Sequence, residues 1–242
     1  MYIAELLEIL SAFFVLSGIL VALLIALNIR RHRQPMKIME AVWPLTGLWA
    51  HWFAWASYRI FGKSTSGPMS DSMSKSRMAS GTGSGSMAMH RSSRPAWRSV
   101  ALSTLHCGAG CTLADILGEW FTFFVPLSIG GSFLAGQWVL DFVLALLLGV
   151  YFQYSAIRGM ERISPAKAFS KALKADFFSL TAWQIGMYTW MAFVIFLIRD
   201  GSSFPKTTWT FWFMMQIAMG IGFFFSFPVN RLLIRTGIKH EM

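Results

Sequence analysis

Apolar runs of about twenty residues recur along this 242-residue chain, and they restrict its fold more than any other feature. A helix of about 20 residues spans the roughly 30 Å of hydrocarbon in a bilayer. Charged residues make up only 13% of the sequence, whereas soluble globular proteins contain about 25%. These features predict an all-α polytopic membrane protein, a bundle of helices surrounded by lipid.

The apolar pattern predicts six transmembrane helices. Their expected ranges are 5–29, 38–61, 99–126, 132–158, 176–199 and 207–230. We therefore divide the chain into two N-terminal helices in residues 1–61, a loop in residues 62–97 and a four-helix membrane region in residues 98–242. The loop is rich in Ser, Gly and Met and nearly free of branched apolar residues, which predicts disorder.

The formal net charge of +10 is a guide to topology. Basic residues flank the apolar runs and form no nucleic-acid-binding motif, so no nucleic acid partner is expected. With six crossings, the positive-inside rule favours both termini in the cytoplasm. The sequence "RRHRQPMK", residues 30–37, breaks the rule in that arrangement. It raises the alternative that the first two spans are not simple crossings.

The segment "LHCGAGCTLADILGEW", residues 105–120, contains both cysteines of the chain within an apolar run. Cys107, Cys111, Asp115 and Glu119 follow one another at intervals of four residues. On a helix this spacing puts them on one face, in a stripe about 18 Å long with thiols at one end and carboxylates at the other. Ionisable residues inside a membrane are costly, so the stripe is a candidate functional site.

The thiols, together with the adjacent His106, form a soft ligand set that suits copper(I). Asp115 and Glu119 would then form a proton relay or a harder binding position for the same cation. The alternative is structural: Cys107 and Cys111 pack as small hydrophobic residues, and the carboxylates reach the lipid headgroups at the helix end.

His51 in the second apolar run has an expected depth similar to that of His106. It is therefore a candidate to complete the metal site. Two facing histidines are alternatively axial ligands of a b-type haem. A third interpretation is a histidine that is hydrogen-bonded inside the bundle and binds nothing.

Methionines extend the possible set of soft ligands. The loop holds Met69, Met73, Met78 and the sequence "MAMH", which contains Met87, Met89 and His90. Met187 and Met191 form a pair four residues apart, as do Met215 and Met219, and this spacing is similar to the Met-x-x-x-Met pairs of eukaryotic copper-uptake channels. Thioethers suit copper(I), although methionine also fills gaps in protein cores.

The segments "QPMKIMEAVWPLTGLW" and "HCGAGCTLADILGEW" resemble an uncharacterised family of bacterial integral-membrane proteins, a domain of unknown function. The resemblance covers residues 34–62 and 97–235, and HCGAGC is its most specific part. It implies a bacterial inner-membrane protein with Met- or His-rich insertions where residues 62–97 lie. A glycine is usual in the family where Ala114 stands. The resemblance implies no established reaction.

The leading hypothesis is an inner-membrane protein that binds copper(I) for metal transport or homeostasis. No nucleotide-binding motif is present, so transport would be passive or driven by ion gradients, and enzymatic activity is not expected. One alternative is a redox, haem-binding or metal-delivery assembly factor in which Cys107 and Cys111 cycle between dithiol and disulfide. Another is a non-catalytic subunit of a homo-oligomer or a larger membrane complex.

Overall fold

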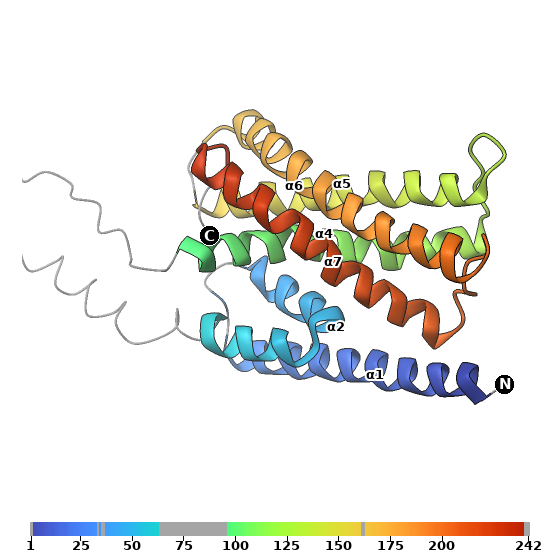
Figure 1. Cartoon of the computed structure of the whole chain (residues 1–242). Coiled ribbons are helices and arrows are strands. Elements are labelled where there is room, and N and C mark those ends of the chain that lie inside the picture. Colours follow the sequence, from blue (N-terminus) through green and yellow to red (C-terminus); the bar gives the residue numbers. More distant parts are fainter. Residues whose placement is uncertain (1, 33, 35–36, 63–95, 161–162, 240–242) are drawn as a thin grey trace, which may run out of the picture.

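The computed structural model describes residues 2–32, 34, 37–62, 96–160 and 163–239. Its helices are α1 (Tyr2–Arg31), α2 (Met39–Ser57), α4 (Ala96–Phe124), α5 (Phe133–Met160), α6 (Pro165–Phe193) and α7 (Trp209–Arg235), with π-helical turns η1 (Tyr58–Gly62) after α2 and η2 (Val194–Ile198) after α6. Figure 1 shows the long helices running roughly side by side. The predicted all-α helical bundle is confirmed, and the predicted loop of residues 62–97 lies almost wholly outside the described residues.

Five segments of the described chain are long and apolar enough to cross a membrane. They are Ala4–Arg31, Trp97–Phe124, Phe133–Gly159, Pro165–Ile198 and Trp209–Arg235. Each has 27 to 34 residues, and at 1.5 Å per residue each exceeds the roughly 30 Å of hydrocarbon. The predicted second crossing, residues 38–61, is the exception.

The helix α2 is broken at its centre. His51 has φ 47° and ψ −132°, which is not a helical conformation. After this residue the chain turns back toward the end of the bundle from which α2 started (Figure 1). The prediction of a second transmembrane helix is therefore wrong: residues 38–61 enter the bundle and return. The apolar pattern in the sequence indicates only how long the apolar run is. It does not predict the change of direction, because that depends on the backbone angles of one residue.

Neighbouring helices cover the break in α2. Gln216 on α7 donates its Nε2 hydrogen to the carbonyl oxygen of Leu48, with an N···O distance of 2.6 Å. A Cβ atom at Gly18 on α1 would collide with the same carbonyl, so the glycine lets α1 pass close to the break. Irregular backbone is tolerated inside a membrane where protein covers it, and α1 and α7 provide that cover.

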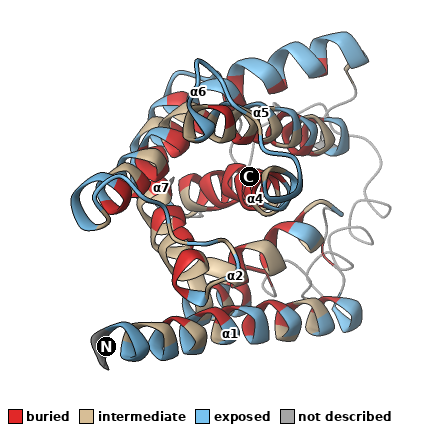
Figure 2. Ribbon diagram, turned by 90° about the vertical axis from the view of Figure 1, so that its right-hand side faces the viewer, coloured by how far each residue is buried: buried red, intermediate tan, exposed pale blue. Residues whose placement is uncertain are grey.

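The helix α4 lies at the centre of the bundle. In its most apolar stretch 72% of residues are buried, whereas the values for the other four crossing helices run from 28% to 39%. Figure 2 shows α4 in the buried colour with the other helices around it. Glycines allow this close packing, because a Cβ at Gly110 would lie 2.9 Å from the Cα of Gly149 on α5. A helix so placed can carry polar residues without exposing them to lipid.

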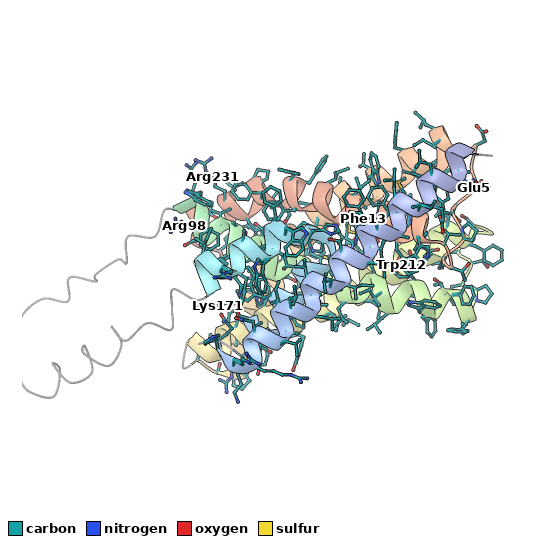
Figure 3. The ribbon with its side chains drawn as sticks, turned by 90° about the horizontal axis from the view of Figure 1, so that it is seen from below. Glu5, Phe13, Arg98, Lys171, Trp212 and Arg231 are labelled. Atoms are coloured by element: carbon teal, nitrogen blue, oxygen red, sulfur yellow. The ribbon has the colours of Figure 1, made fainter. Side chains whose placement is uncertain are left out.

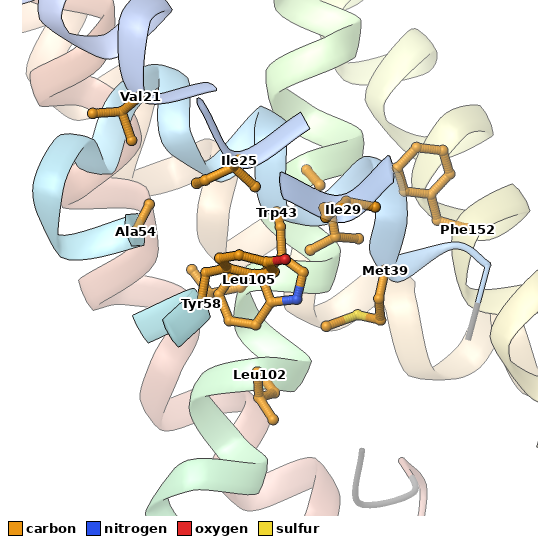
Figure 4. Packing of buried hydrophobic residues seen from close by; sticks show 12 residues of the cluster. Val21, Ile25, Ile29, Met39, Trp43, Ala54, Tyr58, Leu102, Leu105 and Phe152 are labelled. Carbon is orange, nitrogen blue, oxygen red and sulfur yellow. The ribbon is translucent and has the colours of Figure 1, made fainter. Parts of the chain in front are cut away.

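A cluster of buried apolar residues attaches α2 to α1, α4 and α5 (Figure 4). The rings of Trp43 and Tyr58 meet edge to face at 5.6 Å between centroids. The hydroxyl of Tyr58 donates to Asn28 Oδ1 on α1 at 3.0 Å. Both ends of the returning segment are thus fixed at the same end of the bundle.

The chain begins and ends at opposite ends of the bundle (Figure 1). The described chain has five helices that are long and apolar enough to cross a membrane, which is an odd number. The predicted arrangement, with both termini on one side of a membrane, needs an even number of crossing helices. Figure 3 shows Arg98, Lys171 and Arg231 at one end of the molecule, while Glu5 and Trp212 lie toward the other.

Candidate functional site

Four residues of α4 form a buried row along one face of the helix, called here the α4 row: Cys107, Cys111, Asp115 and Glu119. Cys107 and Cys111 are 0% exposed, Asp115 is 1% exposed and Glu119 is 2% exposed. The structure therefore places both carboxylates inside the bundle, covered by neighbouring helices. The row runs from the thiols, nearer the start of α4, to the carboxylates, nearer its end.

Sulfur side chains from three helices belong to one buried cluster, which includes the thiols of the α4 row. Both cysteines are free, and they belong to one buried cluster with Met187 and Met191 from α6 and Met215 and Met219 from α7. Met219 also accepts a hydrogen bond from the Thr112 hydroxyl, with an O···S distance of 3.8 Å. The fold thus joins two methionine pairs that are separate in the sequence.

The carboxylate end lines a small cavity between α4, α5, α6 and α7. Its volume is about 20 Å³, roughly the space that one water molecule needs. Asp141 of α5 joins Asp115 and Glu119 in its wall, and three of the four methionines, Met187, Met191 and Met215, line it too. Gly118 makes room for Asp141, because a Cβ there would collide with the Asp141 carboxylate.

Lys206, in the connection between η2 and α7, lies at the carboxylate end of the α4 row. Its Nζ lies 2.7 Å from Glu119 Oε2 and donates to Thr122 Oγ1 at 2.5 Å. Gln137 Nε2 donates to the other Glu119 oxygen at 2.5 Å. Glu119 is therefore held by an ion pair and an amide, while neither oxygen of Asp115 has a hydrogen-bond partner among the described residues.

A second lysine lies at the thiol end. Lys239 is 2% exposed although it follows the end of α7, and its Nζ donates to Asn230 Oδ1 at 2.7 Å. Asp176 of α6 lies within electrostatic range of Lys239 and beside the Cys107 thiol. A series of neighbouring ionisable groups thus extends through the bundle. It begins at Lys239, includes Asp176 and the α4 row, and ends at Lys206.

The two predicted histidines pack against aromatic rings of α5 and α1. His106 is buried, and its ring packs against Phe152 of α5 with 6.1 Å between centroids. His51 packs against Phe14 of α1 at 5.9 Å and lines a separate cavity of about 770 Å³. Among the described residues no group of three or more His, Cys, Asp or Glu side chains is arranged to hold a metal ion. Met87, Met89 and His90 lie outside the described residues.

Sequence reasoning missed Asp141, Asp176, Lys206 and Lys239. A signal existed for Asp141, because an ionisable residue within an apolar run is by default a functional candidate. Asp176 stood at the very start of its predicted span, where a charge is unremarkable. Nothing in the sequence indicates that the two lysines, in a connection and in the tail, pair with buried groups of α4, α6 and α7.

A comparison with models of protein families matches residues 96–239 to the family described as Domain of unknown function (DUF4396). The match confirms the resemblance to an uncharacterised family for this part of the chain. It includes the whole α4 row and the residues around it, and it does not include residues 34–62. No curated protein and no solved structure matches the chain.

Proposed function

The chain belongs to the family of domains of unknown function DUF4396, and we propose from the chemistry of its interior that it conducts copper(I) across a membrane. Two thiols and four thioethers belong to one buried cluster on and around the central helix. This convergence of six sulfur side chains carries the proposal. Soft sulfur ligands select copper(I) among biological metal ions.

The arrangement suits passage better than permanent storage. An ion that moves must bind well enough to enter and weakly enough to leave, usually through several neighbouring positions. The cluster that contains the thiols and the wall of the carboxylate cavity share Met187, Met191 and Met215, so these thioethers would be the ligands between the two positions. Asp115 and Glu119 would then be the second position on the path.

The orientation we propose follows from where the basic residues lie. At the end where α4 begins, the described lysines and arginines are Arg30, Arg31, Lys37, Arg59, Arg98, Arg158, Lys167, Lys171, Lys174, Arg231, Arg235 and Lys239. At the opposite end they are Arg199 and Lys206. The positive-inside rule then puts the C-terminus and the thiols nearer the cytoplasm, and the N-terminus and Lys206 outside. The bacterial inner membrane is the setting implied by the family resemblance.

Metal content after growth with copper tests the proposal directly. We expect the purified full-length protein to retain copper, and the double variant Cys107→Ser/Cys111→Ser to lose most of it, because serine oxygens bind copper(I) poorly. The matched control is Ala109→Ser/Ala114→Ser, which adds two hydroxyl groups at other fully buried positions of α4. Its copper content should equal that of the wild type.

Copper uptake by proteoliposomes tests conduction separately from binding. Met215→Leu/Met219→Leu should slow uptake, since leucine preserves the packing volume and removes the thioether. A wild-type protein without copper, or a cysteine variant that retains as much copper as the wild type, would contradict the proposal.

A further inference from the structure

A further cavity adjoins the carboxylate cavity at Asp115 and Met215, and neither Lys206 nor Asp141 lines it. It has a volume of about 270 Å³ and is bounded by α1, the break of α2, α4 and α7. Asp115 lines both this cavity and the small carboxylate cavity described above. The residues lining the larger cavity include no lysine, arginine or histidine, so within it no cationic side chain neutralises the Asp115 carboxylate.

Several buried polar atoms of the residues that line this cavity have no hydrogen-bond partner among the described residues. Asp115 is 1% exposed, and both of its oxygens are without hydrogen bonds among the described residues. Gln216 Oε1 is likewise buried and unpartnered, while the amide nitrogen of the same side chain is held by the Leu48 carbonyl. A buried carboxylate without a partner is strongly unfavourable, and a cation in the cavity would offset that cost.

Apart from Thr112, the remaining lining residues are aromatic or aliphatic or carry a thioether. Indole rings of Trp49, Trp120, Trp209 and Trp212 line the cavity, and those of Trp120 and Trp212 stack with 6.2 Å between centroids. Indole faces attract organic cations, whose charge is spread over apolar groups. Trp120 and Trp209 are about 40% exposed at the bundle surface, where an amphiphilic molecule could enter from the bilayer.

We propose that this cavity binds a lipophilic organic cation, an ammonium group with apolar substituents, and that Asp115 is its counter-ion. A hard inorganic cation such as calcium or magnesium would require several oxygen ligands, and the lining residues include only one carboxylate. An uncharged lipid would leave that carboxylate unpaired. The site goes beyond copper conduction, because it takes a different class of ligand in a cavity lined by residues of α1 and α2, which do not line the acidic cavity.

Binding of tetraethylammonium to the full-length protein in detergent, measured by titration calorimetry, tests the proposal. We expect saturable binding that Asp115→Asn weakens roughly tenfold or more, because the variant keeps the shape and loses the charge. Trp209→Leu should weaken binding several-fold, and Trp209→Phe should retain most of it, since phenylalanine preserves an aromatic face. Circular dichroism establishes that each variant is folded.

Three controls make the result specific. Asp141→Asn removes a buried carboxylate that lines only the other cavity, and it should leave tetraethylammonium binding unchanged. The uncharged molecule of the same shape, 3,3-diethylpentane, should not displace the cation. Cys107→Ser/Cys111→Ser should abolish copper retention and leave tetraethylammonium binding intact, so each proposal can fail without the other. Absence of saturable binding, equal losses in the Asp115 and Asp141 variants, or displacement by the uncharged molecule would overturn the inference.

Discussion

Two lysines lie at the ends of the row of buried ionisable groups, and each is held by polar partners. Lys206 pairs with Glu119 at 2.7 Å, and Lys239 bonds to Asn230 at 2.7 Å. An ion pair removed from water is tolerated only while both members are present. The lysines therefore belong to the same structural unit as the acids that they face, although they lie far from them in the sequence.

Replacing Lys206 should destabilise the protein through the group that it leaves behind. Lys206→Met leaves Glu119 buried without its counter-charge, and we expect a loss of up to about 3 kcal/mol in the free energy of unfolding. The measurement is the midpoint of thermal unfolding in detergent. Adding Glu119→Gln to the same chain should recover much of the loss. Lys167→Met, at an exposed position on α6, is the control, and a loss equal to that of Lys206→Met would contradict the explanation.

At the scale of elements, α2 shows how a single residue changes the topology. Its sequence is apolar enough to suggest a crossing, and its helix is continuous on either side of His51. The positive φ of that residue favours glycine, because a side chain there is strained. The ring of His51 packs against Phe14, and the adjoining turn is held by Gln216. Contacts with α1 and α7 thus maintain a backbone conformation that the residue alone would avoid.

A pair of substitutions at His51 separates backbone strain from side-chain contacts. His51→Ala and His51→Gly both remove the ring, and they differ mainly in the freedom of the backbone. Because only glycine adopts the observed angles without strain, we expect the glycine variant to be more stable than the alanine variant by roughly 1 kcal/mol. Thermal unfolding of the two proteins measures the difference. If α2 were a continuous crossing helix, alanine would be the more stable of the two.

At the scale of the whole molecule, the returning α2 resolves the conflict around residues 30–37. In a six-helix arrangement this basic segment falls on the side with fewer positive charges. Because α2 goes back to its starting end, Arg30, Arg31 and Lys37 lie at the same end as Arg98 and Arg231. One change in topology therefore brings the positive charges together and separates the two chain termini.

Protease protection of terminal tags tests this topology. A tag at the N-terminus should be cleaved when protease is added to spheroplasts, and a tag at the C-terminus should be protected until the cells are lysed. Immunoblotting of the two tagged proteins gives the result. Protection of both tags would restore the arrangement with both termini in the cytoplasm and would contradict the orientation proposed here.

The sequence alone was sufficient for the helical membrane fold and for five of its crossing helices, because apolar length is a local property of the chain. It was also sufficient to place Cys107, Cys111, Asp115 and Glu119 in one row, because helical spacing assigns them to one face whatever surrounds them. Only the tertiary structure showed that Met187, Met191, Met215 and Met219 meet around those residues. Packing between helices also decided the return of α2, the burial of Lys239 and the position of Asp141 beside Asp115. These features depend on contacts between segments that are distant in the sequence, and no local sequence pattern predicts such contacts.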